Sequence, residues 1–137
     1  MDVATWLEPG ETETASWTAA VPTLGGRGAK YGGRLHLTSR RLVWVPLRVE
    51  LVSVSSGVYT PIEAGGSWWE LTLDEVAYVE ADAERRALLH VVGDDGSRTS
   101  FLVTAGRFGP VWSKKNQGAR DDAVSRIGRA VGTSRGA

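Results

Sequence analysis

The sequence predicts a mainly β (α+β) domain in which about seven antiparallel strands form a barrel and one C-terminal α-helix covers its open end. Apolar and polar residues alternate with a period of two over much of the chain, and Gly, Pro and Asp separate these segments. After residue 119 the apolar period becomes helical. A chain of 137 residues, 42% of them hydrophobic, can bury a core of its own. We therefore expect one domain over residues 1–137, with its core at about residues 7–131.

The clearest strand signal is a hairpin over residues 33–46. Leu35 and Leu37 alternate with polar residues, as in a half-buried strand. Residues 38–40 favour a tight turn, and residues 41–45 are β-branched and aromatic. This stretch predicts two consecutive antiparallel strands.

Five further strands and two long connections complete the expected sheet. The further strands are predicted over residues 11–21, 68–73, 77–81, 86–92 and 98–103. A turn at residues 94–96, Asp-Asp-Gly, joins the last two strands. The connections are a glycine-rich loop at residues 23–33 and a longer segment at residues 47–67, part of which could extend a strand.

The end of the chain predicts one amphipathic helix. Its apolar residues fall at helical spacing from Ala119 to Val131, and Gly132 is expected to end it. Such a helix can cover the apolar side chains at the open end of a bent sheet.

Composition and charge exclude several classes of function. Acidic and basic residues both number 16, so no net charge attracts nucleic acid, and we expect no nucleic-acid partner. Residues 1–84 are net acidic and residues 85–137 net basic, which we interpret as two halves that attract each other within one fold. The absence of cysteine excludes disulfides and thiolate sites. The N-terminus does not resemble a signal peptide and no apolar run could span a bilayer, so a cytoplasmic location is expected. Arg outnumbers Lys by 13 to 3, which indicates a G+C-rich, bacterial source.

Three phrases of the sequence resemble a known family. The hairpin reads Gly-x-Leu-x-Leu-Thr-x-x-Arg-Leu-x-Trp over residues 33–44 and resembles the signature hairpin of GRAM domains, a branch of the pleckstrin-homology-like (PH-like) superfamily. Residues 71–79 resemble the family's second phrase, and residues 7–11 resemble the Leu-x-x-Gly-Glu that precedes its first strand. Residues 104–118 have no counterpart. The resemblance implies a PH-like barrel capped by a helix. It also implies a non-enzymatic binding or adaptor module that makes protein contacts at or near a membrane.

Basic and aromatic residues supply the candidate binding site. Those singled out are Arg27, Lys30, Arg34, Arg40, Arg41, Trp68 and Trp69. By resemblance to PH domains that bind inositol phosphates, the basic loop could instead bind anionic lipid or phosphate headgroups at the inner face of the membrane, although His36 replaces one expected Arg. For Arg41 alone we expect a structural role, as an ion pair or a carbonyl cap that ties the turn to the next strand. Trp68 and Trp69 are adjacent in a strand and must point to opposite faces, which could leave one indole as a partner anchor. The basic residues at 112–120 are interpreted as the lead-in to the helix.

The sequence contains no arrangement typical of catalysis. His36 and His90 lie in strands without a third ligand at metal spacing, so no metal or cofactor is expected. Both are interpreted as satisfied or solvent-facing sheet histidines. No Gly-x-Ser-x-Gly motif occurs, and residues 25–30 match neither nucleotide-binding glycine motif. We expect a protein that is not an enzyme. The alternative is a small-ligand binder, or an enzyme that uses the open end of the barrel around His90.

Overall fold

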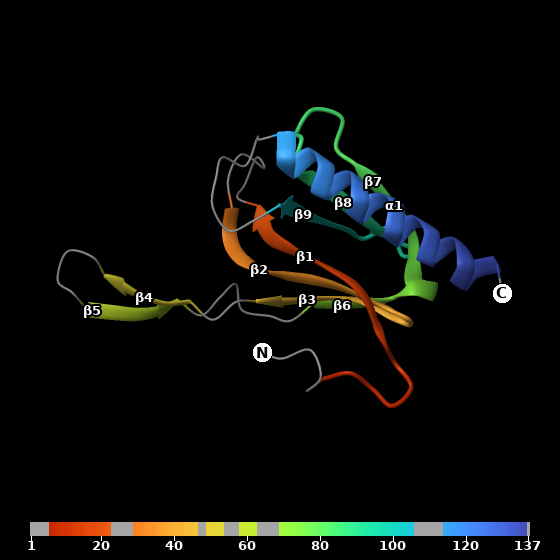
Figure 1. Ribbon diagram of the computed structural model, residues 1–137, viewed down its shortest axis with the longest axis horizontal. Coiled ribbons are helices and arrows are strands. Elements are labelled where there is room, and N and C mark those ends of the chain that lie inside the picture. The colour runs from red at the N-terminus through yellow and green to blue at the C-terminus, as the bar shows by residue number, and fades with distance from the viewer. Residues whose placement is uncertain are drawn as a thin grey trace.

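Seven antiparallel strands form one bent sheet in this computed structural model, which describes residues 6–22, 29–46, 49–53, 58–62, 69–105 and 114–136 (Figure 1). The strand order is β6-β3-β2-β1-β9-β8-β7, so β6 and β7 are the two ends and the sheet is not closed. The strands are β1 (Glu13–Pro22), β2 (Ala29–Thr38), β3 (Arg41–Pro46), β6 (Trp69–Thr72), β7 (Val76–Ala81), β8 (Leu88–Gly93) and β9 (Arg98–Thr104). The short 3-10 helix η2 (Leu73–Glu75) joins β6 to β7. The mainly β fold class is confirmed, as an open sheet.

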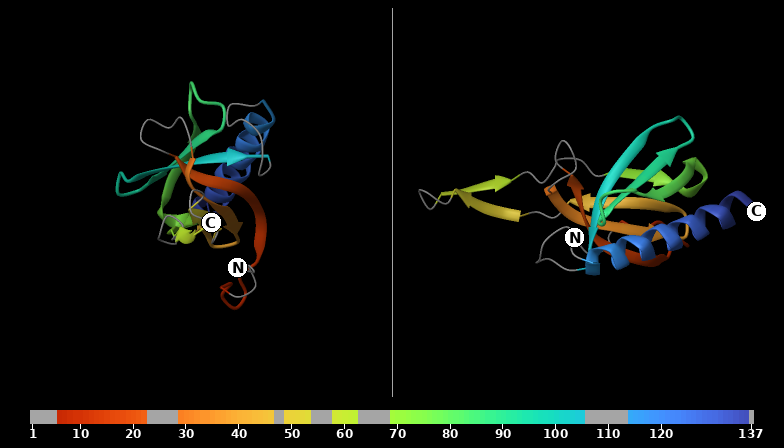
Figure 2. Two further views of the ribbon diagram at one scale, coloured as in Figure 1. Left: turned by 90° about the vertical axis from the view of Figure 1, so that its left-hand side faces the viewer. Right: turned by 90° about the horizontal axis from the view of Figure 1, so that it is seen from above.

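Strand β1 connects the two halves of the sheet. It pairs with β2 along its length but with β9 only from Thr18 to Ala20. The helix α1 (Lys114–Gly136) packs against β7, β9 and η2 across the concave side (Figure 2). The core between sheet and helix includes Trp17, Leu35, Phe101 and Ile127. The concave side of the sheet is therefore closed by α1, as the change of period predicted.

The hairpin is confirmed as β2 and β3, with its turn at Ser39 and Arg40. The structure differs from the prediction before it, because residues 29–33 belong to β2 and not to a glycine-rich loop. Gly33 shows the physical reason. A Cβ atom there would lie 2.6 Å from the ring of Trp44 and from the carbonyl oxygen of Val45. This glycine allows an indole to pack on the backbone of a strand.

Helix α1 is longer than its apolar pattern predicted. It begins at Lys114 instead of Ala119, and it continues past Gly132 to Gly136. Val131 is buried in the core, and the hydroxyl of Ser134 donates a hydrogen bond to Asp74 in η2. These tertiary contacts stabilise a last turn that glycine alone would weaken.

The long connection contains a second, two-stranded sheet. Its strands are β4 (Val49–Ser53) and β5 (Val58–Ile62), and they project away from the main sheet (Figure 1). Within the described residues, no helix combines the length and the apolar character needed to cross a membrane.

Candidate functional site

Arg41 of the predicted basic cluster is an internal residue. Its Nε donates to Glu11 Oε2 at 2.9 Å and its Nη2 to Glu11 Oε1 at 2.9 Å, a two-point pair. Nη1 donates to Glu70 Oε2 at 2.6 Å, and Nη2 also donates to the carbonyl oxygen of Trp6 at 3.1 Å. The hydrogen bonds from Arg41 lower the pKa of Glu11 to about 2 against the opposing effect of burial. The internal ion pair expected for Arg41 is confirmed.

Thr38 completes this network at the hairpin turn. Its hydroxyl donates to Glu11 Oε2 at 2.6 Å and accepts the backbone N–H groups of Arg40 at 3.1 Å and Arg41 at 3.0 Å. A hydroxyl has one donor and two acceptor positions, and all three are used. We call Thr38, Arg41, Glu11 and Glu70 the turn network.

The other described arginines of the predicted cluster point to separate partners. Arg34 donates from Nε to Ser16 Oγ at 3.0 Å and from Nη1 to Thr18 Oγ1 at 3.3 Å. Arg40 contacts Glu8 Oε2 at 3.3 Å and the carbonyl oxygen of Pro9 at 3.2 Å. Arg27 and the side chain of Lys30 lie outside the described residues. The three described arginines therefore bond to different partners, and binding by the glycine-rich loop stays a prediction.

Trp69 lies on the inner side of the sheet. It is half-buried in β6 and meets Phe101 edge-on, with 5.2 Å between ring centroids. Trp68, the other half of the predicted pair, lies outside the described residues. Trp69 thus contributes packing to the core.

The two histidines are satisfied within the sheet, as the sequence predicted. His36 Nδ1 lies 2.6 Å from Glu13 Oε1. His90 lies between Asp82, 2.9 Å from Nε2, and Ser100, 2.7 Å from Nδ1. Burial raises the pKa of Asp82, but hydrogen bonds from His90 and from two backbone amides outweigh it and hold this pKa at about 2. Among the described residues, no three His, Asp or Glu side chains gather in a way that could hold a metal ion.

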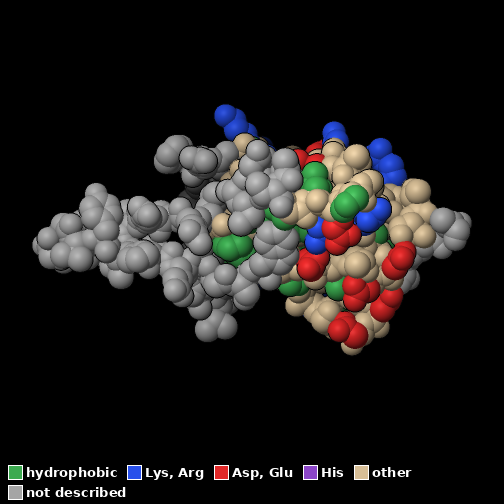
Figure 3. All heavy atoms as spheres, turned by 90° about the horizontal axis from the view of Figure 1, so that it is seen from below, with side chains coloured by type: hydrophobic (Ala, Val, Ile, Leu, Met, Phe, Trp, Pro, Cys, Tyr) green, Lys and Arg blue, Asp and Glu red, His purple; other side chains and the backbone are tan. Residues whose placement is uncertain are grey.

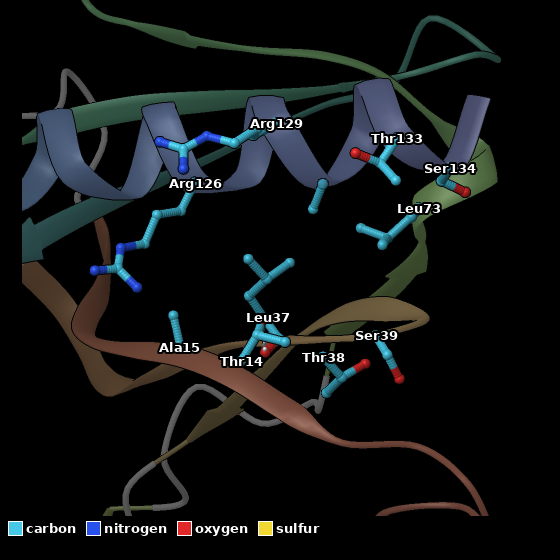
Figure 4. A pocket seen from close by; sticks show the side chains of 11 residues that line it. Thr14, Ala15, Leu37, Thr38, Ser39, Leu73, Arg126, Arg129, Thr133 and Ser134 are labelled. Carbon is cyan, nitrogen blue, oxygen red and sulfur yellow. Dashed lines mark hydrogen bonds between the residues drawn. The ribbon is translucent and has the colours of Figure 1, made fainter. Parts of the chain in front are cut away.

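A cavity of about 500 Å³ lies between α1 and the sheet (Figure 4). We call it the α1 groove. Its helix wall is the C-terminal half of α1, and its other wall is the start of β1 with the β2–β3 turn. The lining residues are Thr14, Ala15, Leu37, Thr38, Ser39, Leu73, Arg126, Arg129, Ala130, Thr133 and Ser134. The volume falls in the usual range for ligand sites.

Two arginines stand on the helix wall of the α1 groove. Arg126 donates from Nε to Asp122 Oδ1 at 3.0 Å, while Asp122 Oδ2 accepts the indole N–H of Trp17 at 3.1 Å. This indole bond, followed by the bond from Arg126, lowers the pKa of Asp122. Arg129 donates from Nη2 to Ser125 Oγ at 3.3 Å. Within the described part of the chain, both Nη atoms of Arg126 and the Nε and Nη1 of Arg129 have no hydrogen-bond acceptor.

The other residues that line the α1 groove are either apolar or carry a hydroxyl group. Leu37 lies between α1 and the strands and Leu73 lies beside Ser134 (Figure 4), and the small side chains of Ala15 and Ala130 also line the groove. On the face seen from below, acidic side chains gather in one part of the described surface, while acidic and basic side chains lie next to one another near its centre (Figure 3). The groove thus combines an apolar lining with positive charge at one end.

Sequence reasoning did not find the α1 groove. It assigned Arg126 and Arg129 to the polar face of a helix, which is where most such arginines lie in solution. Their spacing of three residues, next to the small Ala130, is the only local signal. The opposite wall comes from residues more than 80 positions earlier, so the site depends on tertiary packing.

Comparison with known proteins shows the fold. No family model matches the chain, and no curated protein does either. One similar solved structure is the C-terminal domain of an unknown protein from Leishmania infantum, with a TM-score of 0.55 and 14% identity over 90% of this chain and 86% of that one. Another is the Vps36 N-terminal PH domain, with a TM-score of 0.59 and 17% identity over 96% of this chain and 86% of that one. The fold is therefore PH-like, as the resemblance implied, while the GRAM branch stays a prediction.

Proposed function

We propose that this chain is a non-enzymatic PH-like binding module, of the GRAM type, that holds an anionic segment of a protein partner in the α1 groove. The observation that carries the proposal is a cavity of about 500 Å³ with two arginines whose remaining N–H donors face no acceptor among the described residues. A guanidinium group with open donors is suited to a carboxylate or phosphate oxygen. The apolar lining would add burial of the ligand's carbon atoms.

The groove has more support than the lipid-binding alternative. In the predicted basic cluster, Arg41 uses each of its nitrogens within the turn network, and Arg34 and Arg40 bond to neighbouring side chains. Among the described residues, Arg34 and Arg40 each leave one nitrogen without an acceptor, whereas Arg126 and Arg129 each leave two, beside an apolar surface. The α1 groove offers positive charge together with a cavity of about 500 Å³.

Calorimetric titration of the full chain with two random peptide pools tests this function. One pool carries a fixed central Glu and the other a fixed central Lys. We expect binding of the acidic pool alone, weakening as salt is added because the arginines are partly exposed to solvent. Ala130→Trp fills the groove and should abolish the binding. Gly118→Trp adds the same side chain at an exposed helix position with open space around it and should leave the binding unchanged.

Two outcomes would contradict the proposal. One is equal binding of both pools, or of neither. The other is binding that persists in Ala130→Trp, since the ligand would then lie elsewhere. Sedimentation with anionic vesicles tests the alternative that the chain binds anionic lipid. Salt-sensitive binding to the vesicles that Ala130→Trp leaves intact would favour a lipid site away from the groove.

A further inference from the structure

We infer that the α1 groove recognises an extended peptide segment with an acidic and an aliphatic side chain two residues apart. This inference rests on the proposed function and specifies its ligand. It follows from the order in which charge, apolar surface and hydroxyl groups occur along the groove.

The helix wall presents side chains at an interval that matches an extended chain. Arg126, Ala130 and Ser134 are four residues apart and form one stripe of α1, all lining the groove. Four residues of α-helix rise about 6 Å. Two residues of an extended strand span about 6.6 Å, and their side chains point to the same side. A peptide along the groove would therefore present every second side chain to successive members of this stripe.

The first position of the stripe is suited to a carboxylate. Asp122 occupies only Nε of Arg126, which lines the groove, so both of its Nη atoms have no acceptor among the described residues. Arg129 adds a second positive charge three residues along the helix. The two arginines bring two positive charges to this end of the groove, and the carboxylate of Asp122 pairs with Arg126.

The second position is suited to an aliphatic side chain. Ala130 lines the groove together with Ala15, Leu37 and Leu73, so this part of the lining is apolar. Two alanines in these positions leave room that larger residues would fill. A Leu, Ile or Val of the ligand could occupy it and be removed from water.

The third position of the stripe, Ser134, disfavours a negatively charged side chain of the ligand. This determines at which end of the groove the acidic residue of the peptide lies. Ser134 donates its hydroxyl proton to Asp74, so a carboxylate already lies at this end. The C-terminus of α1 is also here, and its exposed carbonyl groups carry partial negative charge. The acidic side chain of the ligand is thus restricted to the Arg126 end.

The other wall offers backbone hydrogen bonds to an extended chain. β1 pairs with β9 only from Thr18 to Ala20, so within the described residues the part from Ala15 to Trp17 has no strand on the side away from β2. A peptide in the groove could pair with this edge, as strands added to exposed sheet edges do. The irregular register at Thr14 limits such pairing to the residues that follow it.

Fluorescence polarisation with short labelled peptides tests the motif on the full chain. The peptides carry one Glu and one Leu in a Ser/Thr background, separated by one, two or three positions. We expect the two-position peptide to bind about tenfold more tightly than the others, because only it presents both side chains to one side. Replacing its Leu by Ala should weaken binding about tenfold.

A charge exchange identifies the arginine. Arg126→Glu should weaken binding of the two-position peptide at least tenfold, and replacing the peptide's Glu by Lys should restore binding to this variant alone. Arg86→Glu makes the same charge change at an exposed loop residue and should have no effect. Both variants should keep the wild-type thermal midpoint, because neither side chain is buried.

The results separate this inference from the proposed function. Equal affinity for all three spacings, with binding still abolished by Ala130→Trp, would overturn the motif and leave the groove as the site. Failure of the charge exchange would also overturn it. Binding that ignores Ala130→Trp would overturn both proposals.

Discussion

The turn network and the α1 groove use arginine in opposite ways. Arg41 is 8% exposed, and its three nitrogens donate to two carboxylates and a carbonyl group. The side chain of Arg126 is 53% exposed and donates from one nitrogen to a neighbour on its own helix. Both residues carry the same charge. They differ in how many guanidinium nitrogens already have an acceptor within the protein, and this number indicates whether an arginine stabilises the fold or is available to a ligand.

Removing each arginine should show the largest difference between the two regions. Arg41→Ala leaves the buried carboxylate of Glu11 without its partner, which should cost about 3–5 kcal/mol of unfolding free energy. Arg126→Ala should change stability by less than about 0.5 kcal/mol, because its ion pair is exposed. Urea denaturation of both variants measures this, and equal losses would remove the distinction.

The second-largest effect should be the loss of stability of the turn network at acidic pH. The pKa of Glu11 is lowered from 4.5 to about 2, so its ionised form stabilises the fold above about pH 4.5 and this contribution is lost as the pH falls toward 2. The full loss is about 3 kcal/mol. Urea denaturation over this pH range should show it.

A control isolates Glu11, because Asp82 titrates in the same range. Glu11→Gln is less stable at neutral pH but lacks this titration, so its stability should fall less steeply with acid. Parallel pH profiles for the two proteins would show that Glu11 does not carry the effect.

Replacing each of two threonines by valine should change the free energy of unfolding by different amounts, and this difference should be smaller than the one between the two arginine variants. Thr38→Val removes a hydroxyl that makes bonds to Glu11 and to the backbone N–H groups of the turn, and should cost about 1–3 kcal/mol. Thr133→Val makes the same change in the α1 groove, where the exposed hydroxyl should contribute less than about 0.5 kcal/mol. Thermal or urea unfolding compares them, and a larger loss at Thr133 would reverse the account.

Replacing Arg40 by alanine should cause the smallest loss of unfolding free energy. It is exposed, and so is its partner Glu8 at 3.3 Å. Arg40→Ala should therefore cost at most about 1 kcal/mol, and less in high salt. Denaturation at two salt concentrations measures this, and a loss close to that of Arg41→Ala would show that position in the cluster matters more than burial.

The sequence predicted the fold where local patterns were enough. Leu35 and Leu37 face the core as alternation requires, and the apolar stripe of α1 buries Ala123, Ile127 and Val131. It was wrong about Gly132, because the bond from Ser134 to Asp74 joins segments 60 residues apart. It was wrong about residues 29–33 because packing of Trp44 against Gly33 cannot be read from glycine content.

The site was harder to predict than the fold. Arg41 and Arg126 are both charged residues in amphipathic elements, and nothing in the local sequence shows that Glu11 and Glu70 will surround the first. The α1 groove joins β1, the hairpin turn and α1, so its shape arises only when the three pack together. The sequence singled out Arg34, Arg40 and Arg41 as binding residues but did not show the partners that they have within the fold. A binding role for this cluster stays a prediction.

NMR chemical-shift mapping of the labelled full chain, titrated with an acidic peptide from the pool, shows whether the ligand binds in the α1 groove. We expect the changes to cluster at Ala15, Leu37, Arg126, Ala130 and Thr133, with little change at Arg41 and Glu11. Changes centred on the β1–β2 connection or on the turn network, with α1 unaffected, would contradict the account.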